Sequence, residues 1–311
     1  MLIRTIVLML ILFSIGFLTV KSIKPAKMCS QPKLHTEEEL KIRCEKEGFW
    51  QIWETLPKEE FWVKSFDDYE LYCILNKQSN FEKNKKIVII SHGLRGMHLN
   101  SIKYANLFWK LGFSTVVYDL RGHGKTKSHN VKLGLTESKD LYEIVQYLKN
   151  KFGDDTLFGL HGESMGAVTT LFATKKLQKE NLMFTFSDCA FYSAKKFIKD
   201  ALKKEKKPVF MYYFINLASV LKFRLILGKV NPYKAITKVK TPICFIHGDK
   251  DELISASHMT MLYDSAKHCP KMKISFPEAE HAKCIIKDAF LYEKTVKEFL
   301  KNTGLFFINE F

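Results

Sequence analysis

The chain has 311 residues, of which 46% are hydrophobic, and its formal net charge at pH 7 is +16. This length and composition are enough to bury a large core in one sizeable domain with appendages, and two equal domains are not required. The charge comes mainly from lysines scattered along helical stretches, without zinc-finger spacing or an aromatic RNA-binding signature, so we expect no nucleic-acid partner. An anionic membrane surface or a lysine-rich proteome explains the charge better.

The seven cysteines lie at irregular spacings and include no C-x-x-C pair. Their odd number indicates free thiols and argues against a disulfide framework, as does the position of Cys73 and Cys244 within apolar, strand-like runs. We therefore expect neither a metal ion nor a cofactor.

A charge-free apolar run extends from Thr5 to Val20, between Arg4 and the lysines at positions 21, 24 and 27. It is shorter than the about 20 residues of a membrane-spanning helix, although flanking residues and snorkelling cations can lengthen it. No A-x-A-like cleavage site follows, so we expect residues 1–27 to be an uncleaved, single-pass membrane anchor, with a cleaved secretory signal as the alternative. The excess of lysines after the run favours a cytoplasmic main domain, by a margin too small to decide the side.

Residues 28–60 form a charged segment that carries the aromatic residues Phe49, Trp50 and Trp53. From Lys33 to about Glu60 the pattern is typical of an amphipathic helix. We expect this N-terminal helical extension to pack its tryptophans on the main domain, with a peripheral contact at a lipid surface as the alternative.

Residues 61–305 contain the pattern of an α/β domain. Two alternating segments around Asp67 and Asp68 predict a hairpin, and the β-branched run from Lys86 to Gly93 is typical of a strand buried on both faces of a sheet. The predicted strands are 61–66, 70–75, 86–93, 113–120, 155–162, 183–188, 241–248 and 271–276, and the predicted helices between them include 101–111, 133–152, 167–177, 257–267 and 288–301. This alternation predicts a mostly parallel, eight-stranded sheet with helices on both faces.

About fifty residues between Asp188 and Thr241 have helical composition and no convincing strand. We expect a helical cap at about residues 191–236, because an insertion between consecutive strands of such a sheet emerges where active sites lie. The segment from Val209 to Phe223 is apolar nearly all round, and we expect its underside to line a substrate pocket. A buried core helix is the alternative.

The sequence Gly162-Glu163-Ser164-Met165-Gly166 matches the pattern G-x-S-x-G at a strand-to-helix junction. A nucleophilic serine needs a base, and the base needs an acid that holds its tautomer. His281, in the loop after the last predicted strand, is the candidate base. Asp251, in the loop after the preceding strand, is the candidate acid, with Asp188 as the main alternative.

Backbone N–H groups after the strand that ends near Ser91 can hold the oxyanion of a tetrahedral intermediate. The glycines of His92-Gly93-Leu94-Arg95-Gly96 let N–H groups point inward, and a helix begins after Ser164. We expect the N–H groups of Leu94 and Met165 to form this oxyanion hole.

With these motifs, the chain resembles the α/β-hydrolase superfamily, and most closely its bacterial membrane-anchored serine hydrolases of the esterase or lipase type. The resemblance covers roughly Phe61 to Asn302. It is carried by the motif at 92–96, Asp119-Leu120-Arg121-Gly122-His123-Gly124, the serine motif, the segment 248–251 and His281. It implies that Ser164, Asp251 and His281 form a triad and that 119–124 is a structural loop in which His123 is architectural. Ala282 departs from the glycine or aromatic residue often found after the histidine, which bears on pocket shape.

The chemistry expected from these residues is hydrolysis of a carboxylic ester through an acyl-enzyme, on a small-molecule acyl or lipid-like substrate. A peptidase or amidase with the same triad is the first alternative. A non-catalytic, membrane-anchored binding protein on a hydrolase scaffold is the second. The oligomeric state is left open.

Overall fold

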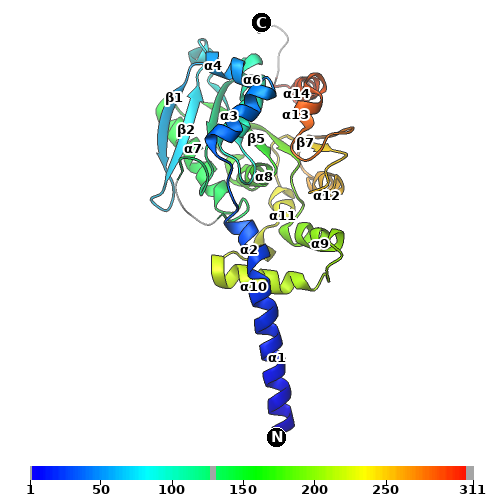
Figure 1. The fold of residues 1–311 in the computed structure, drawn as a ribbon. Helices are drawn as coiled ribbons and strands as arrows, with labels where there is room; N and C mark the ends of the chain where they lie inside the picture. The colour runs from blue at the N-terminus through cyan, green and yellow to red at the C-terminus, as the bar shows by residue number, and fades with distance from the viewer. Residues whose placement is uncertain (1, 127–130, 306–311) are drawn as a thin grey trace.

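The computed structural model describes residues 2–126 and 131–305, and Met1 of the predicted N-terminal segment lies outside them. Its centre is an eight-stranded sheet with the order β1-β2-β4-β3-β5-β6-β7-β8 (Figure 1). β2 pairs antiparallel with β1 and β4, and every other pairing is parallel. The strands are β1 (Glu59–Lys64), β2 (Glu70–Asn76), β3 (Lys86–Ser91), β4 (Ser114–Tyr118), β5 (Leu157–Glu163), β6 (Leu182–Asp188), β7 (Ile243–Gly248) and β8 (Lys271–Phe276). The predicted fold class and the predicted hairpin are confirmed.

Helices cover both faces of the sheet, and the central strands are apolar on both sides as a result. In β3, Ile87 and Ile89 pack into one hydrophobic cluster, whereas Val88 and Ile90 pack into the other. The first cluster includes side chains of α7 (Glu137–Phe152) and α8 (Met165–Leu177), and the second includes side chains of α6 (Ile102–Lys110) and α14 (Ala289–Asn302). The smaller helices of this body are α5 (Phe81–Asn84), α12 (Ser257–Ser265), α13 (Cys284–Lys287) and the 3₁₀ helix η1 (His98–Ser101).

The predicted start of one helix, Leu133, is wrong. Leu133 and Gly134 both have positive φ, 52° and 96°, which an α-helix does not accept, and α7 begins only at Glu137. The apolar side chains of Val131 and Leu133 are buried in the loop before α7. These apolar residues therefore belong to a packed loop and not to the buried face of a helix.

The N-terminal extension forms two helices where the sequence predicted one. α3 (Glu37–Lys46) begins with a capping box in which the Thr36 hydroxyl and the Glu39 carboxylate exchange hydrogen bonds with backbone N–H groups. Gly48, with φ 78°, separates α3 from α4 (Trp50–Thr55). Trp53 is buried in the α6 and α14 face, so the extension covers that side of the sheet (Figure 1).

The insertion between β6 and β7 contains α9 (Ala194–Lys204), α10 (Met211–Phe223), the 3₁₀ helix η2 (Leu227–Lys229) and α11 (Pro232–Ile236). α10 packs against α9 and against the N-terminal helices α1 (Leu2–Lys21) and α2 (Ile23–Ser30). α1 extends away from the body beyond α10 (Figure 1). Among the described residues, no single helix has the length and hydropathy of a membrane span. The pair Met211–Phe223 and Leu227–Ile236 meets the criteria only jointly, with a bend of 103°.

Candidate active site

Ser164 lies at the sharp turn between β5 and α8. Its φ of 56° and ψ of −116° are strained for a residue with a side chain, and they project the hydroxyl out of the turn. The flanking glycines are required by close packing: a Cβ on Gly162 would lie 2.3 Å from the carbonyl oxygen of Gly166, and one on Gly166 would lie 2.1 Å from that of Ser91. The small residues of the serine motif therefore permit the turn and its close approach to β3.

The structure brings His281 and Asp251 to Ser164. Nε2 of His281 lies 2.9 Å from the Ser164 Oγ, and Nδ1 of His281 lies 2.7 Å from Oδ2 of Asp251. These distances suit a serine hydroxyl that donates to Nε2 and a ring N–H that donates to the carboxylate. All three side chains lie where β5, β7 and β8 end, because the carboxyl ends of parallel strands share one edge of the sheet.

Asp251 is held as a carboxylate. Its Oδ1 accepts hydrogen bonds from the backbone N–H groups of Leu253 and Ile254, and Nε2 of His247 lies 3.1 Å from its Oδ2. Burial by itself raises the pKa of Asp251, but the hydrogen bonds with His247 and His281 outweigh it and hold that pKa well below its ordinary value. The negative charge is therefore present at neutral pH, where it can fix the tautomer of His281.

Leu94 and Met165 supply backbone N–H groups beside the serine. Met165 is the first residue of α8, and the loop after β3 approaches so closely that a Cβ on Gly93 would lie 3.4 Å from the Ser164 Cβ. Among the described residues, neither N–H group finds a hydrogen-bond acceptor. Both are thus free to receive a negatively charged oxygen, and the positive end of α8 adds to their effect.

Asp188, the alternative acid, does not reach His281. It is fully buried at the end of β6, where its Oδ2 accepts hydrogen bonds from the hydroxyl groups of Tyr104 at 3.1 Å and Tyr292 at 3.0 Å. Burial raises the pKa of Asp188 to about 6, with a further contribution from the neighbouring Glu163. The backbone carbonyl of Asp188 accepts a hydrogen bond from the Ser164 N–H at 2.8 Å, so Asp188 stabilises the turn that carries the serine.

The loop at 119–124 is a structural support. Oδ1 of Asp119 accepts from the backbone N–H of His98 at 2.7 Å, and its Oδ2 accepts from the Lys125 N–H at 2.8 Å. Nε2 of His123 accepts from the Arg95 N–H at 3.2 Å, which fixes the loop after β3. Burial lowers the pKa of His123, so this ring stays neutral while it accepts that bond.

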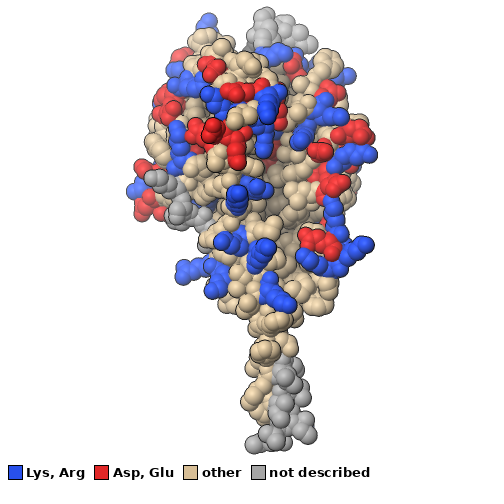
Figure 2. All heavy atoms as spheres, in the orientation of Figure 1, with Lys and Arg blue, Asp and Glu red and all other residues tan. Residues whose placement is uncertain are grey.

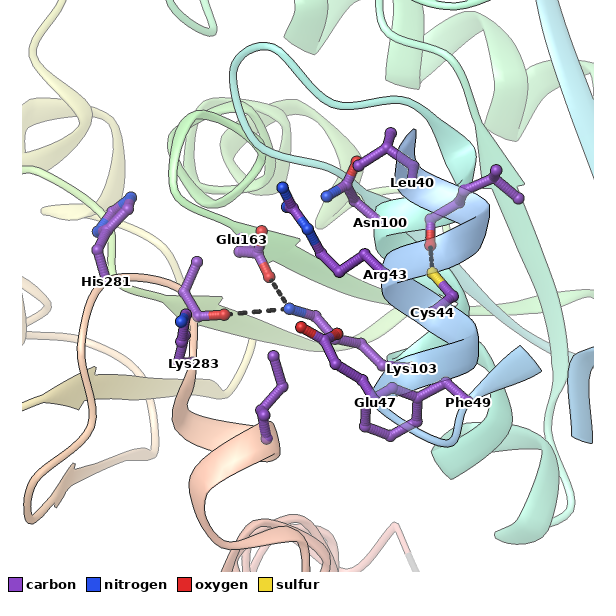
Figure 3. Close-up of a pocket in the computed structure, with 13 residues that line it drawn as sticks. Leu40, Arg43, Cys44, Glu47, Phe49, Asn100, Lys103, Glu163, His281 and Lys283 are labelled. Carbon is purple, nitrogen blue, oxygen red and sulfur yellow. Dashed lines mark hydrogen bonds and ion pairs between the residues drawn. The ribbon is translucent and has the colours of Figure 1, made fainter. Parts of the chain in front are cut away.

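A cavity of about 270 Å³ opens beside His281 (Figure 3). Its walls come from α3 and the residues after it, from η1 and α6, and from the loop that carries His281. The lining residues are Leu40, Arg43, Cys44, Glu47, Phe49, Leu99, Asn100, Lys103, Glu163, His281, Ala282, Lys283 and Ile286. The N-terminal extension thus forms one wall of this cavity.

Comparisons with known proteins agree with this architecture. The family model described as "Serine aminopeptidase, S33" matches residues 82–211. The uncharacterized protein YqkD of Bacillus subtilis is 35% identical over 221 residues, which are 69% of this chain and 71% of that protein. The esterase Pf2001 of Pyrococcus furiosus superposes with a TM-score of 0.65 at 22% identity, over 80% of this chain and 92% of that one. The chain belongs to the α/β-hydrolase superfamily. The uncharacterized membrane protein YNL320W of Saccharomyces cerevisiae is also similar, at 23% identity over 64% of this hydrolase and 65% of that protein.

The expectation that the underside of the segment Val209–Phe223 lines a substrate pocket stays a prediction for this α/β-hydrolase. No residue of that segment lines the cavity at His281, because α10 packs against α1, α2 and α9. Sequence reasoning missed the wall that α3 provides. Nothing local in 37–46 indicates it, since the approach of α3 to residues 281–286 depends on tertiary packing.

Sequence reasoning also missed the buried ion pair between Lys103 and Glu163. The two side chains are 2.6 Å apart, and Lys103 Nζ donates to the Ala282 carbonyl at 3.1 Å, next to His281. A lysine within the apolar stretch of a predicted helix was the available signal.

One group of three possible metal ligands occurs among the described residues of the hydrolase, namely Cys189, Asp251 and His281. Asp251 and His281 already bond each other, and burial raises the pKa of the Cys189 thiol, which disfavours the thiolate that would bind a metal. We therefore assign no metal to this group.

Proposed function

We propose that the protein is a serine hydrolase that cleaves carboxylic esters, with Ser164 as nucleophile, His281 as general base and Asp251 as the acid that orients it. The observation that carries the proposal is the continuous hydrogen-bonded path from Ser164 Oγ to His281 Nε2 at 2.9 Å and from His281 Nδ1 to Asp251 at 2.7 Å.

The reaction follows from these positions. Ser164 Oγ attacks the ester carbonyl carbon while its proton passes to His281 Nε2, and the resulting oxyanion accepts from the N–H groups of Leu94 and Met165. Collapse of this intermediate breaks the bond to the alcohol oxygen, which takes the proton from His281. A water molecule then gives a proton to His281 and attacks the acyl-enzyme, and the acid leaves as Ser164 recovers its proton.

Labelling by a fluorophosphonate probe tests the proposal. The folded wild type should form a covalent adduct, and Ser164→Ala should not. Ser79→Ala is the matched control, since Ser79 is an exposed serine between β2 and α5 and should leave labelling intact. A folded wild type that does not label would favour the non-catalytic binding protein.

An aminopeptidase is the second candidate, because the matching family model carries that description. An aminopeptidase needs an acidic group that binds the substrate ammonium. Of the two glutamates that line the cavity, Glu163 is already paired with Lys103, which leaves Glu47 alone against Arg43 and Lys283, whose charges would repel a cation. Parallel assays on 4-nitrophenyl esters and aminoacyl 4-nitroanilides should show ester cleavage; faster anilide cleavage would reverse the order of the two candidates.

We also propose that residues 1–27 attach the protein to a membrane, with 28–60 as an extension and 61–305 as the hydrolase domain that carries the insertion at 191–236. The exposed apolar side chains of α1, among them Phe13 and Phe17, support this, as do the lysines that follow the helix. A yeast relative named as a membrane protein is consistent with it.

A further inference from the structure

The cavity beside His281 differs in character from an acyl-chain tunnel. Charged and amide side chains form much of its lining, and it borders His281, the proposed general base (Figure 3). The inference below rests on the proposed function, because it concerns what that site accepts.

The two buried charges at the floor of the cavity neutralise each other. Glu163 accepts from Lys103 at 2.6 Å and from the Tyr104 hydroxyl at 2.8 Å. Burial by itself lowers the pKa of Lys103, but Glu163 and the nearby Asp188 raise it above its ordinary value, so the ammonium persists. Because the two charges pair with each other, neither is available to bind a charged ligand.

Arg43 is a different case. Its side chain extends from α3 into the cavity, toward the side on which Glu163 lies (Figure 3). Within residues 2–126 and 131–305 its guanidinium has no ion pair and no hydrogen bond, whereas most charged side chains around it are paired. A guanidinium offers five N–H donors in a planar fork that matches a carboxylate or a phosphate.

Two further donors border the same space. Oδ1 of Asn100 accepts from the Met97 N–H at 3.1 Å, which fixes the amide and leaves its NH₂ group without a partner among the described residues. Lys283 also lines the cavity, and among the described residues it forms one ion pair, with the exposed Glu280 at 3.4 Å. Among the described residues that line the cavity, Glu47 is the one carboxylate outside the buried pair, so the donors of Arg43, Asn100 and Lys283 outnumber it.

We propose that Arg43, Asn100 and Lys283, here called the donor pocket, bind an anionic group of the substrate. The preferred esters then carry a carboxylate or a phosphate a few bonds from the scissile carbonyl. Charge-assisted hydrogen bonds from Arg43 supply most of the preference for anionic over neutral esters. The N-terminal extension, which carries Arg43, then determines the substrate specificity of the hydrolase.

Paired substrates separate the two sources of the anion. In the acyl arm, the mono-4-nitrophenyl ester of glutaric acid is compared with 4-nitrophenyl pentanoate. In the alcohol arm, butyrylglycerol 3-phosphate is compared with butyrylglycerol. We expect the anionic member of at least one pair to have the higher kcat/KM, and the arm that shows it identifies whether the anion belongs to the acid or the alcohol.

Arg43→Gln should lower kcat/KM for the anionic ester by about 10- to 100-fold and leave the neutral ester within about twofold, because a charge-assisted hydrogen bond is lost only with the anion. Arg43→Lys should restore part of the loss. Lys46→Gln is the matched control, since Lys46 is exposed on the same helix and outside the cavity lining. Equal losses on both esters would overturn the proposal.

A binding measurement on the wild type keeps the proposal falsifiable without variants. Free glutarate should slow fluorophosphonate labelling more than uncharged pentanamide does, and added KCl should remove the difference. Normal labelling with no effect of glutarate and no preference in either arm would overturn the donor pocket and leave the proposed hydrolase intact. Absence of labelling would instead contradict the proposed function.

Discussion

Lys103 is buried between the serine turn and the loop that carries His281. Its ammonium joins Glu163, on β5, to the carbonyl of Ala282, whose φ of 60° is strained for a residue with a Cβ. The lysine therefore acts as a positioning residue, because one of its partners precedes Ser164 in the chain and the other follows His281.

Replacing Lys103 by Met should lower the free energy of unfolding by about 3–5 kcal/mol, because Glu163 is left as an uncompensated buried charge. The double variant Lys103→Met with Glu163→Gln should regain much of this loss, since the neutral amide still accepts from Tyr104. Urea denaturation of the two variants measures the difference. A double variant as unstable as the single one would show that the lost contact with Ala282 dominates.

Asp188 should make stability fall as pH rises. Its pKa is about 6 in the folded protein against an ordinary 3.8, chiefly through burial, so the folded state holds the proton more tightly than the unfolded chain. Between these two values the free energy of unfolding should fall with rising pH by about 3 kcal/mol in total, at about 1.4 kcal/mol per unit.

The variant Asp188→Asn isolates this contribution. Its unfolding free energy should lack that fall, so the difference between wild type and variant should change with pH between about 4 and 6 and level off outside that range. Denaturation series at several pH values give the comparison, in which the other titrating groups cancel. A difference that stays constant across the series would exclude Asp188 as the source.

At the scale of elements, the turn from β5 to α8 depends on close contact with β3. A Cβ on Gly166 would meet the backbone oxygens of Ser91 at 2.1 Å and His92 at 2.6 Å, and neither can yield without moving the loop that carries Leu94. The geometry of the serine and that of the proposed oxyanion hole are therefore coupled through this glycine.

Gly166→Ala should cost about 1–3 kcal/mol of stability through overpacking and should slow fluorophosphonate labelling. Gly228→Ala is the matched control, because the nearest atom to its added Cβ, the Tyr212 hydroxyl oxygen, is 3.9 Å away. Thermal unfolding and labelling rates report the two effects. Unchanged labelling in Gly166→Ala would refute the coupling.

The elements that sequence predicted correctly have local causes. The β-branched run of β3 predicts a buried strand, and the glycines around Ser164 predict a tight turn. Each signal lies within a few residues of the chain. Strand order then brings Asp251 and His281 to the same edge. The local pattern did not predict the start of α7, because it does not show the positive φ of Leu133. It did not predict the cavity wall formed by α3 either, because the approach of α3 to residues 281–286 depends on tertiary packing.

At the scale of the whole molecule, exposed apolar side chains of α1 and α10 lie at one end of the body. On the face that Figure 2 shows, Lys and Arg side chains outnumber Asp and Glu near the part of the body from which α1 extends, whereas both signs are mixed over the rest of the body. On α10 and the residue before it, Phe210, Tyr213, Leu217 and Leu221 are exposed at helical spacing, and α10 packs against α1. An apolar stripe bordered by lysines fits the interface of an anionic bilayer.

Replacing Phe210 and Leu221 by Ser in the full chain should therefore weaken binding to vesicles of phosphatidylcholine and phosphatidylserine by about tenfold, since partial burial of two large side chains is worth about 1–2 kcal/mol. Phe290→Ser is the matched control, because Phe290 is 81% exposed on α14, in a part of the body remote from α1 (Figure 1). Vesicle co-sedimentation measures the fraction of protein bound to the vesicles, with fluorophosphonate labelling as the test of folding.

Equal weakening of vesicle binding by the control would mean that exposed apolar area alone governs binding. Unchanged binding of the α10 variant would contradict a contact between α10 and the lipid. A tenfold loss confined to the α10 variant would show that the exposed face of α10 contacts the lipid surface beside α1.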